Sequence, residues 1–164
     1  MNRFRSLVLL SCVLAPIISC SNLPRDPKQT LRSVQTRPLR VGLVEHPPWV
    51  IRGDGEPRGA EVELVREFAV GLGTTPEWHW GGAQQQMETL QDYGLDLVIG
   101  GFTSSSPWKD YVGFTAPYFE EDRVKHVMAA PPGENGFIKR LDEFLHQKRS
   151  SVASLLQQQE GSAK

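Results

Sequence analysis

Cysteine is scarce in this 164-residue chain: one, Cys12, lies inside an N-terminal apolar stretch, and the other, Cys20, lies at its end. A domain that begins after Cys20 therefore has no disulfide and no free thiol, and its stability has to come from a hydrophobic core. An excess of charge of one sign is also lacking, since 18 Lys and Arg face 19 Asp and Glu. Because neutralising phosphates requires clustered basic residues, this balance argues against nucleic acid as a main partner.

Long hydrophobic runs are lacking as well. No apolar run of about 18 residues occurs after the N-terminal region, which excludes a polytopic membrane protein. At the N-terminus, Arg3 and Arg5 precede an apolar stretch, residues 7–18. It is shorter than the roughly 20 residues that a membrane-spanning helix needs. We predict a signal peptide over residues 1–19.

The end of this stretch, Ile17-Ile18-Ser19-Cys20, resembles the lipobox of bacterial lipoproteins. The resemblance implies that Cys20 is acylated through its thiol and becomes the mature N-terminus. The protein would then be exported and lipid-anchored to a bacterial membrane, facing the periplasm or the cell exterior. The alternative is an ordinary secretory signal with a chance Cys. Residues 20–38, with three Pro, scattered charge and no apolar period, predict a lipidated tether.

From residue 39 onward, apolar periodicity predicts strands and helices in alternation. The predicted elements, in the order strand, helix, strand, helix, strand, are residues 39–44, 64–72, 77–80, 84–93 and 95–99. This order indicates right-handed crossovers. We therefore predict an α/β fold: a single doubly wound, mostly parallel sheet with helices on both faces, spanning residues 39–157.

The C-terminal part predicts one more strand and further helix. Residues 123–130 form the predicted strand, and Pro131-Pro132-Gly133 follow it as a turn. Apolar residues at helical spacing predict a helix over 137–145 and a short final helix over 152–156. Residues 158–164 are polar and predict a loose tail.

Two loops with chemistry-bearing side chains follow predicted strands at their carboxyl ends, where open α/β sheets bind ligands. The first loop, residues 45–50, holds Glu, His, two Pro and Trp, and the second, residues 100–108, combines glycines, four hydroxyls and Trp. A surface turn rich in Gly and Ser is the alternative interpretation of the second loop. Its position after a buried strand favours a ligand site.

Five segments resemble, in order and spacing, the first lobe of bacterial extracellular solute-binding proteins of family 3, the polar amino-acid type. They are residues 39–42 (LRVG), 47–49 (PPW), 59–64 (GAEVEL), 94–103 (GLDLVIGGFT) and 114–118 (FTAPY). The resemblance implies that a small polar solute binds at the first lobe. It also implies a role in transport, with an ABC transporter permease as a partner.

The resemblance carries site residues over one at a time. Glu45 or His46 matches the polar wall of the ligand site, Trp49 the aromatic after the Pro pair, Gly101 a main-chain contact and Thr103 a hydroxyl contact. Trp108 stands where the family has the Arg that holds the ligand's α-carboxylate. Because an indole cannot replace a guanidinium fork, ordinary amino acids are expected to bind poorly. The candidate ligand-binding residues are Glu45, His46, Trp49, Gly101, Thr103 and Trp108.

The family would continue after Tyr118 into a second lobe of about a hundred residues, the usual size of a domain, whereas 46 residues follow Tyr118 here. Residues 127–145 resemble the segment that returns to the first lobe, which implies that the second lobe is omitted. A second protomer in a homodimer, or a partner protein, could stand in for it. The alternative is an adaptor or regulatory lipoprotein that docks a protein on the former ligand face through Trp49, Trp108 and Tyr118.

Patterns typical of enzymes are not found. The four His residues show no metal-ligand spacing, and the chain has neither a P-loop nor a dinucleotide fingerprint. We therefore expect no catalytic residues, no metal, no cofactor and no enzymatic activity. Some relatives of the solute-binding fold are dehydratases, so fold alone does not decide this point.

Overall fold

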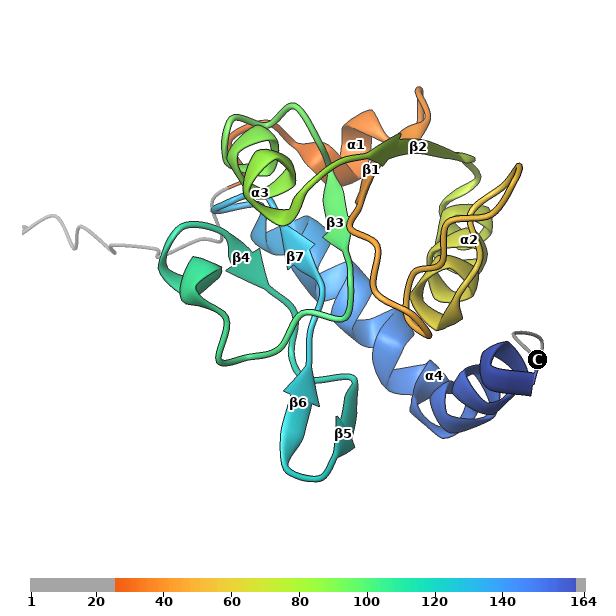
Figure 1. Ribbon diagram of the computed structural model, residues 1–164. Helices are drawn as coiled ribbons and strands as arrows, with labels where there is room; N and C mark the ends of the chain where they lie inside the picture. Colours follow the sequence, from red (N-terminus) through yellow and green to blue (C-terminus); the bar gives the residue numbers. More distant parts are fainter. Residues whose placement is uncertain (1–25, 162–164) are drawn as a thin grey trace, which may run out of the picture.

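The computed structural model describes residues 26–161, which form a five-stranded sheet in the order β2-β1-β3-β7-β4 (Figure 1). Its strands are β1 (Leu39–Leu43), β2 (Pro76–Trp80), β3 (Leu97–Ile99), β4 (Gly113–Phe114) and β7 (Ala129–Ala130). β1 pairs parallel with β2 and β3, while β7 runs antiparallel to β3 and β4. Four strands thus share one direction, and the predicted mostly parallel α/β fold is confirmed.

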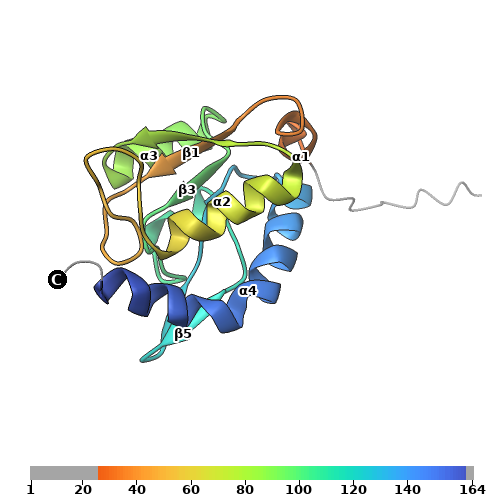
Figure 2. The ribbon, with the colours of Figure 1, turned by 90° about the vertical axis from the view of Figure 1, so that its right-hand side faces the viewer.

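Helices cover both faces of this sheet (Figures 1 and 2). The helices are α1 (Thr30–Ser33), α2 (Ala60–Leu72), α3 (Ala83–Gln91), the 3-10 helix η1 (Pro107–Asp110) and α4 (Asn135–Gly161). Between the sheet and helices α2 and α4 lies the main core, which includes Val41, Leu43, Leu97, Ile99, Phe68 and Phe137. On the opposite face lies the α3 core, formed by Met87, Leu90, Leu95, Val98, Val112 and Ala129.

Alternation along the central strands explains this division. Val41 and Leu43 point into the main core, so the intervening Gly42 faces α3. A Cβ atom on Gly42 would lie 2.5 Å from Gln86 Oε1 on α3. Glycine at this position therefore lets α3 pack directly on the sheet.

Residues 26–38 differ from the tether expected from the sequence. The backbone N–H groups of Lys28 and Thr30 donate to the Glu134 carboxylate at 2.7 and 2.6 Å. Val34, just after α1, is fully buried in the main core. The prediction of a tether is thus wrong for this segment, which belongs to the folded domain.

The C-terminal part also differs from its prediction. Residues 123–130 do not form one strand: β6 (Val124–His126) pairs antiparallel with β5 (Phe119–Glu121) in a separate ribbon, and β7 joins the main sheet. The ribbon projects from the sheet at the bottom of Figure 1. Asp122 and Arg123 join its strands with positive φ angles of 48° and 67°. Two such residues in succession are typical of a tight two-residue hairpin turn.

The two predicted C-terminal helices are one, because α4 runs unbroken for 27 residues. The predicted loose tail is therefore wrong for residues 158–161, which are helical. The signal peptide over residues 1–19, the lipidation of Cys20 and residues 162–164 lie outside the described residues. They stay predictions.

Candidate ligand-binding site

The two predicted ligand loops meet in the structure. β1 and β3 are parallel neighbours, with Leu43 opposite Ile99, so their carboxyl ends lie at the same edge of the sheet. His46, in the loop after β1, places its Nδ1 atom 2.8 Å from the carbonyl oxygen of Gly100, in the loop after β3. One ring of the first loop thus holds the backbone of the second.

Gly101 is needed at this junction for two reasons. Its φ of +63° is a left-handed conformation that a side chain disfavours. A Cβ atom there would also collide with the His46 ring and lie 2.7 Å from Cδ1 of Trp49. Of the predicted site residues, the structure therefore brings His46, Trp49 and Gly101 into direct contact.

A buried carboxylate supports the second loop from below. Glu61, in the first turn of α2, is fully buried, and its Oε2 accepts the backbone N–H groups of Gly100 and Gly101 at 2.8 and 2.9 Å. Its Oε1 accepts the Tyr118 hydroxyl at 2.6 Å. Burial raises the pKa of Glu61, and these three hydrogen bonds, with the nearby His46, oppose that rise. Burial and the Glu61 carboxylate together raise the pKa of Tyr118.

Aromatic rings gather beside the junction, and we call Trp49, Phe119 and His126 the aromatic cluster. Trp49 stacks on His126 with ring centroids 4.0 Å apart and lies 5.8 Å from Phe119. The ribbon carries Phe119 and His126, and a β-bridge between Thr103 and His126 ties the ribbon to the second loop. Trp49 and His126 are only 6% and 8% exposed.

His126 has a hydrogen-bonding atom that is unused within the described residues. Its Nδ1 atom is buried and has no hydrogen-bond partner among residues 26–161. Burial lowers the pKa of His126, and repulsion by His46 lowers it further, against a weaker opposing effect of the Gly101 backbone. Since the ordinary value is about 6.5, the ring is mostly neutral at pH 7.

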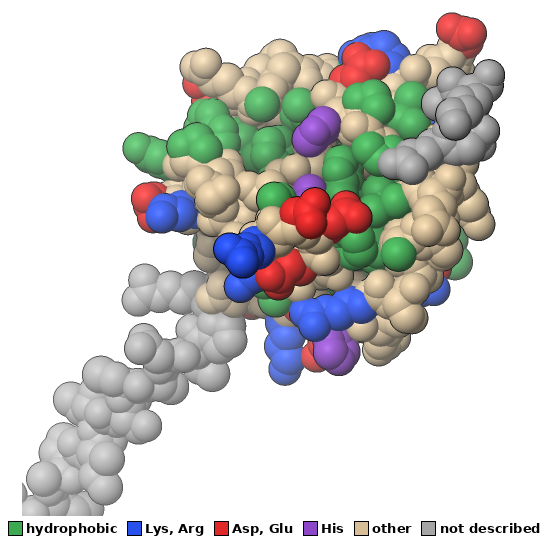
Figure 3. Space-filling view, turned by 60° about the horizontal axis from the view of Figure 1, so that its bottom comes forward, with side chains coloured by type: hydrophobic (Ala, Val, Ile, Leu, Met, Phe, Trp, Pro, Cys, Tyr) green, Lys and Arg blue, Asp and Glu red, His purple; other side chains and the backbone are tan. Residues whose placement is uncertain are grey.

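A cavity of about 330 Å³ opens beside the aromatic cluster. Its walls come from the loop after β1, from the ribbon and from the end of α4, and its lining residues are Pro48, Trp49, Phe119, Glu121, His126, Ala153, Leu156 and Gln157. Figure 3 brings the ribbon end of the molecule forward and shows hydrophobic side chains over much of this face, with acidic and basic groups near its centre. This volume lies within the range of small-ligand pockets.

The other predicted site residues take different positions. Thr103 places its hydroxyl 2.9 Å from that of Ser105, at the bridge to His126. Glu45 is exposed, and its carboxylate lies 3.7 Å from Arg52 Nε. Neither Glu45 nor Thr103 lines the 330 Å³ cavity.

Trp108, which stands where the family has an Arg, lies in η1 and packs against the α3 core. Its one ring contact in the described part of the chain is with Tyr111, at 6.2 Å. The structure therefore does not bring Trp108 to the aromatic cluster. It covers a hydrophobic core instead.

Two residues of this site were missed from the sequence. Glu61 precedes Leu64, Val65 and Phe68 by three, four and seven positions, and this spacing puts it on the buried face of α2. That signal was present in the sequence. His126 had none, because its burial depends on the ribbon and on a stacking partner that is distant in the chain.

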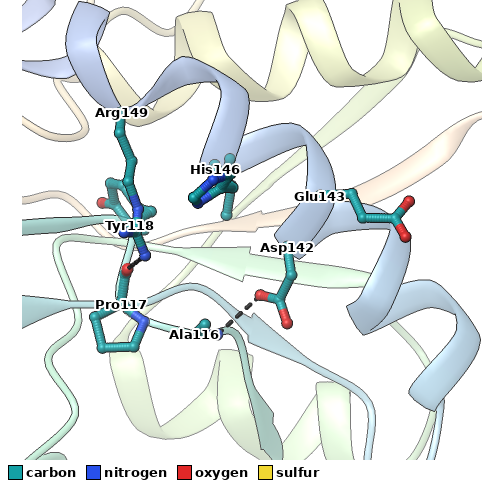
Figure 4. Close-up of a pocket in the computed structure, with 8 residues that line it drawn as sticks. Ala116, Pro117, Tyr118, Asp142, Glu143, His146 and Arg149 are labelled. Carbon is teal, nitrogen blue, oxygen red and sulfur yellow. Dashed lines mark hydrogen bonds between the residues drawn. The ribbon is translucent and has the colours of Figure 1, made fainter.

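A second cavity, of about 300 Å³, lies between α4 and the segment before the ribbon (Figure 4). Asp142 accepts the Ala116 backbone N–H at 2.8 Å, and Arg149 donates to the Pro117 carbonyl at 2.7 Å. Burial raises the pKa of Asp142, and the Ala116 hydrogen bond opposes this. These side chains already fasten the segment to α4, so the cavity is a weaker ligand site than the one beside the aromatic cluster.

Residues 26–161 contain no group of three or more His, Cys, Asp or Glu side chains placed to hold a metal ion. No helix among them combines the length and apolar character that crossing a bilayer requires.

Solved structures share this fold. The arginine-bound form of domain 1 from TmArgBP is 23% identical, with a TM-score of 0.61 over 66% of this chain and 91% of that one. An amino acid ABC transporter substrate-binding protein from Streptococcus pneumoniae bound to L-arginine is 11% identical, with a TM-score of 0.70 over 79% and 97%. An ancestral amino acid-binding protein, described as a precursor of cyclohexadienyl dehydratase, is 13% identical, with a TM-score of 0.69 over 79% and 98%.

At these identities the solved structures establish the fold alone, and they are mainly binding proteins. No curated protein matches the chain. The family model for bacterial extracellular solute-binding proteins, family 3, matches residues 39–158, which covers the sheet, both ligand loops, the ribbon and most of α4. The resemblance noted in the sequence is thereby confirmed, and the chain belongs to the bacterial extracellular solute-binding proteins of family 3.

Proposed function

We propose that this protein is a lipid-anchored, extracytoplasmic solute-binding component of an ABC transporter that binds a small polar solute with a single lobe. The observation that carries the proposal is the 330 Å³ cavity beside Trp49 and His126, next to the carboxyl ends of β1 and β3. Related folds bind solutes, since two of the similar structures hold arginine. The proposal includes no catalysis, because the Glu61 carboxylate is fully buried and all its bonds are to the protein itself.

The tight hairpin of the ribbon supports a single lobe. The resemblance places the second lobe between the segment that ends near Tyr118 and the returning segment. Here β5 and β6 join through Asp122 and Arg123, so nothing is inserted between them. A similar structure, domain 1 from TmArgBP, is matched over 91% of its length.

The alternative, an adaptor that docks a protein on the former ligand face, is weakened by burial. Trp49 is 6% exposed and Tyr118 is 2% exposed, so neither is available as an aromatic anchor without rearrangement. Trp108 is partly buried against the α3 core. A partner that docks on this face would therefore have to use the exposed ribbon, where Val124 is 43% exposed.

A solute screen tests the binding function. The purified protein should be heated with a library of amino acids, amines and small organic acids, and a binding solute should raise the melting temperature. At a hundredfold excess over Kd, a ligand adds about 2.7 kcal/mol to the free energy of unfolding. Val70→Ser, at an exposed site on α2, is a matched control that should respond like the unaltered protein. A library without any stabilising solute would contradict the proposal.

The anchor is tested separately. Cys20→Ser should release the protein from membranes or leave it uncleaved, because it removes the thiol that would carry the lipid. Membrane fractionation with and without detergent measures this outcome. An unchanged detergent-dependent fraction would mean that the lipobox prediction is wrong.

A further inference from the structure

The end of α4 forms one wall of the 330 Å³ cavity. Ala153, Leu156 and Gln157 line it, and their spacing of three and four residues puts them on one face of the helix. This part of α4 is fastened to the domain, since Val152 is fully buried in the main core and Leu156 is 8% exposed. The site therefore has a second wall that belongs to the same lobe as the first.

The lining of this cavity contains an acidic side chain and no cationic one. Glu121 contributes a carboxylate and Gln157 an amide, and neither side chain makes an ion pair or hydrogen bond within residues 26–161. The aromatic cluster also lines the cavity, with Phe119 as its partly exposed member, and no Lys or Arg lines the cavity. Carboxylates, amide oxygens and aromatic rings attract cations.

This lining does not favour a carboxylate. Such a group would enter beside Glu121 without a basic partner, while Trp108, in the place of the family's Arg, packs against the α3 core. Since charge-assisted hydrogen bonds are the strong ones in such sites, the α-carboxylate of an amino acid would be bound poorly or repelled. An amine or guanidinium without that carboxylate fits the lining better.

We propose that the last turns of α4 close the ligand site within the single lobe, with Gln157 as a ligand-contacting residue, and that the pocket selects a small organic cation over an amino acid. This inference rests on the proposed function, because it requires that a solute enters the cavity. It goes beyond that function by naming the second wall and the ligand class. Gln157 and Glu121 then determine specificity.

Calorimetry with a matched pair of solutes tests the ligand class. Agmatine is arginine without its α-carboxylate, so the two compounds share the guanidinium and differ at the group in question. We expect agmatine to bind at least tenfold more tightly than arginine, and glutamate not to bind. Equal affinities, or tighter binding of arginine, would overturn the selection of a cation while leaving solute binding intact.

Variants test the role of α4. Gln157→Ala and Glu121→Gln should each weaken agmatine binding about five- to tenfold. The matched controls are Gln147→Ala, an exposed position on α4, and Glu88→Gln, an exposed acid on α3 that lines neither cavity. Neither control should change the affinity. Equal losses in variants and controls would overturn the assignment of this wall.

A steric variant locates the site. Ala153 is exposed and lines the cavity, so Ala153→Trp should fill it and abolish agmatine binding while the melting temperature of the free protein stays within a few degrees. Undiminished binding of any solute by this variant would show that the solute binds elsewhere. That result would overturn closure by α4 and leave the binding function standing, whereas a protein that binds no solute would fail both proposals.

Discussion

Two buried polar groups at the ligand edge of the sheet, Glu61 and His126, differ in how they are satisfied. The Glu61 carboxylate accepts three hydrogen bonds, from Gly100, Gly101 and the Tyr118 hydroxyl. His126 stacks on an aromatic ring, and its Nδ1 has no partner in the described part of the chain. Both are almost fully enclosed.

This difference in hydrogen bonding implies different roles for the two groups. A buried group whose bonds are complete holds the structure around it, and its removal leaves several partners unsatisfied. A buried group with an open bonding position has capacity for a ligand or a water molecule. Glu61 therefore holds the frame of the site, whereas His126 keeps a hydrogen-bonding atom, unused by the described part of the chain, beside the cavity that it lines.

The largest expected effect comes from removing the satisfied group. Glu61→Ala would leave the amides of Gly100 and Gly101 and the Tyr118 hydroxyl without a partner, and each such loss costs about 1–3 kcal/mol. We expect the free energy of unfolding to fall by about 3–5 kcal/mol in urea denaturation. Glu63→Ala, which breaks an ion pair with Arg66 near the surface of the same helix, should cost less than about 1 kcal/mol. Equal effects of the two substitutions would contradict the framing role.

A smaller effect is expected from removing one bond of the three. Tyr118→Phe keeps the ring in contact with Trp49 and deletes the hydroxyl that donates to Glu61. Because Glu61 keeps its two backbone donors, the loss should be about 1–2 kcal/mol. Thermal unfolding of Tyr118→Phe and Glu61→Ala, measured side by side, compares their losses of stability. A loss as large as that of Glu61→Ala would mean that the hydroxyl, and not the pair of amides, holds the carboxylate.

The unsatisfied group predicts a pH dependence. The pKa of His126 is lower in the folded protein than its unfolded value of about 6.5, so the folded state binds fewer protons. The corresponding stability is fully present above pH 6.5 and is lost as pH falls through 6.5 toward the folded pKa. His126→Phe, which keeps an aromatic ring at this position, should flatten the slope of stability against pH in this window by up to one proton. An unchanged slope would place the titrating group elsewhere.

Glu61 should act in the opposite sense. Its pKa is raised by burial, so the stability linked to it is present below its unfolded value of about 4.3 and declines as pH rises through the folded pKa. Comparing the pH profiles of Glu61→Gln and His126→Phe should separate the two slopes. A Glu61→Gln profile identical to that of the unaltered protein would mean that the carboxylate titrates alike in both states.

The smallest effect is expected at the edge of the site. Glu45 is about half exposed and forms a 3.7 Å ion pair with Arg52. Surface pairs of this kind contribute about 0–1 kcal/mol, so Glu45→Gln should change the free energy of unfolding by less than about 0.5 kcal/mol. Since Glu45 does not line the 330 Å³ cavity, agmatine affinity should also stay within twofold. A larger loss of affinity would restore Glu45 to the ligand wall, as the resemblance implies.

Elements defined by local patterns were predictable. The apolar alternation of β1 and the helical spacing in α2, which ends at a left-handed Gly73, are properties of neighbouring residues. Residues 26–38 were not predictable in this way, because the bonds from Lys28 and Thr30 to Glu134 join positions more than a hundred residues apart. Two Pro and scattered charge in this segment resemble a tether until that acceptor is known.

The candidate site follows the same division. Contact among His46, Trp49 and Gly101 could be expected, because adjacent parallel strands bring the loops at their carboxyl ends together. The resemblance could not show that Trp108 turns into the α3 core or that Gln157 reaches the cavity. Both positions depend on packing between elements that are distant in the chain. Gln157 reaches the cavity because α4 is one unbroken helix.

The fastening of residues 26–38 to the domain has a consequence for orientation at the membrane. α1 lies at the end of the molecule opposite the β5–β6 ribbon in both Figure 1 and Figure 2. If Cys20 carries the lipid, the chain between it and Asp26 spans at most about 20 Å when fully extended. The α1 end is then held close to the bilayer, and the solute cavity, beside the ribbon at the other end, lies farther from it. A permease in the same membrane would then lie nearer to α1 than to the solute cavity. Solute delivery would require the domain to rotate about its short connection to the lipid.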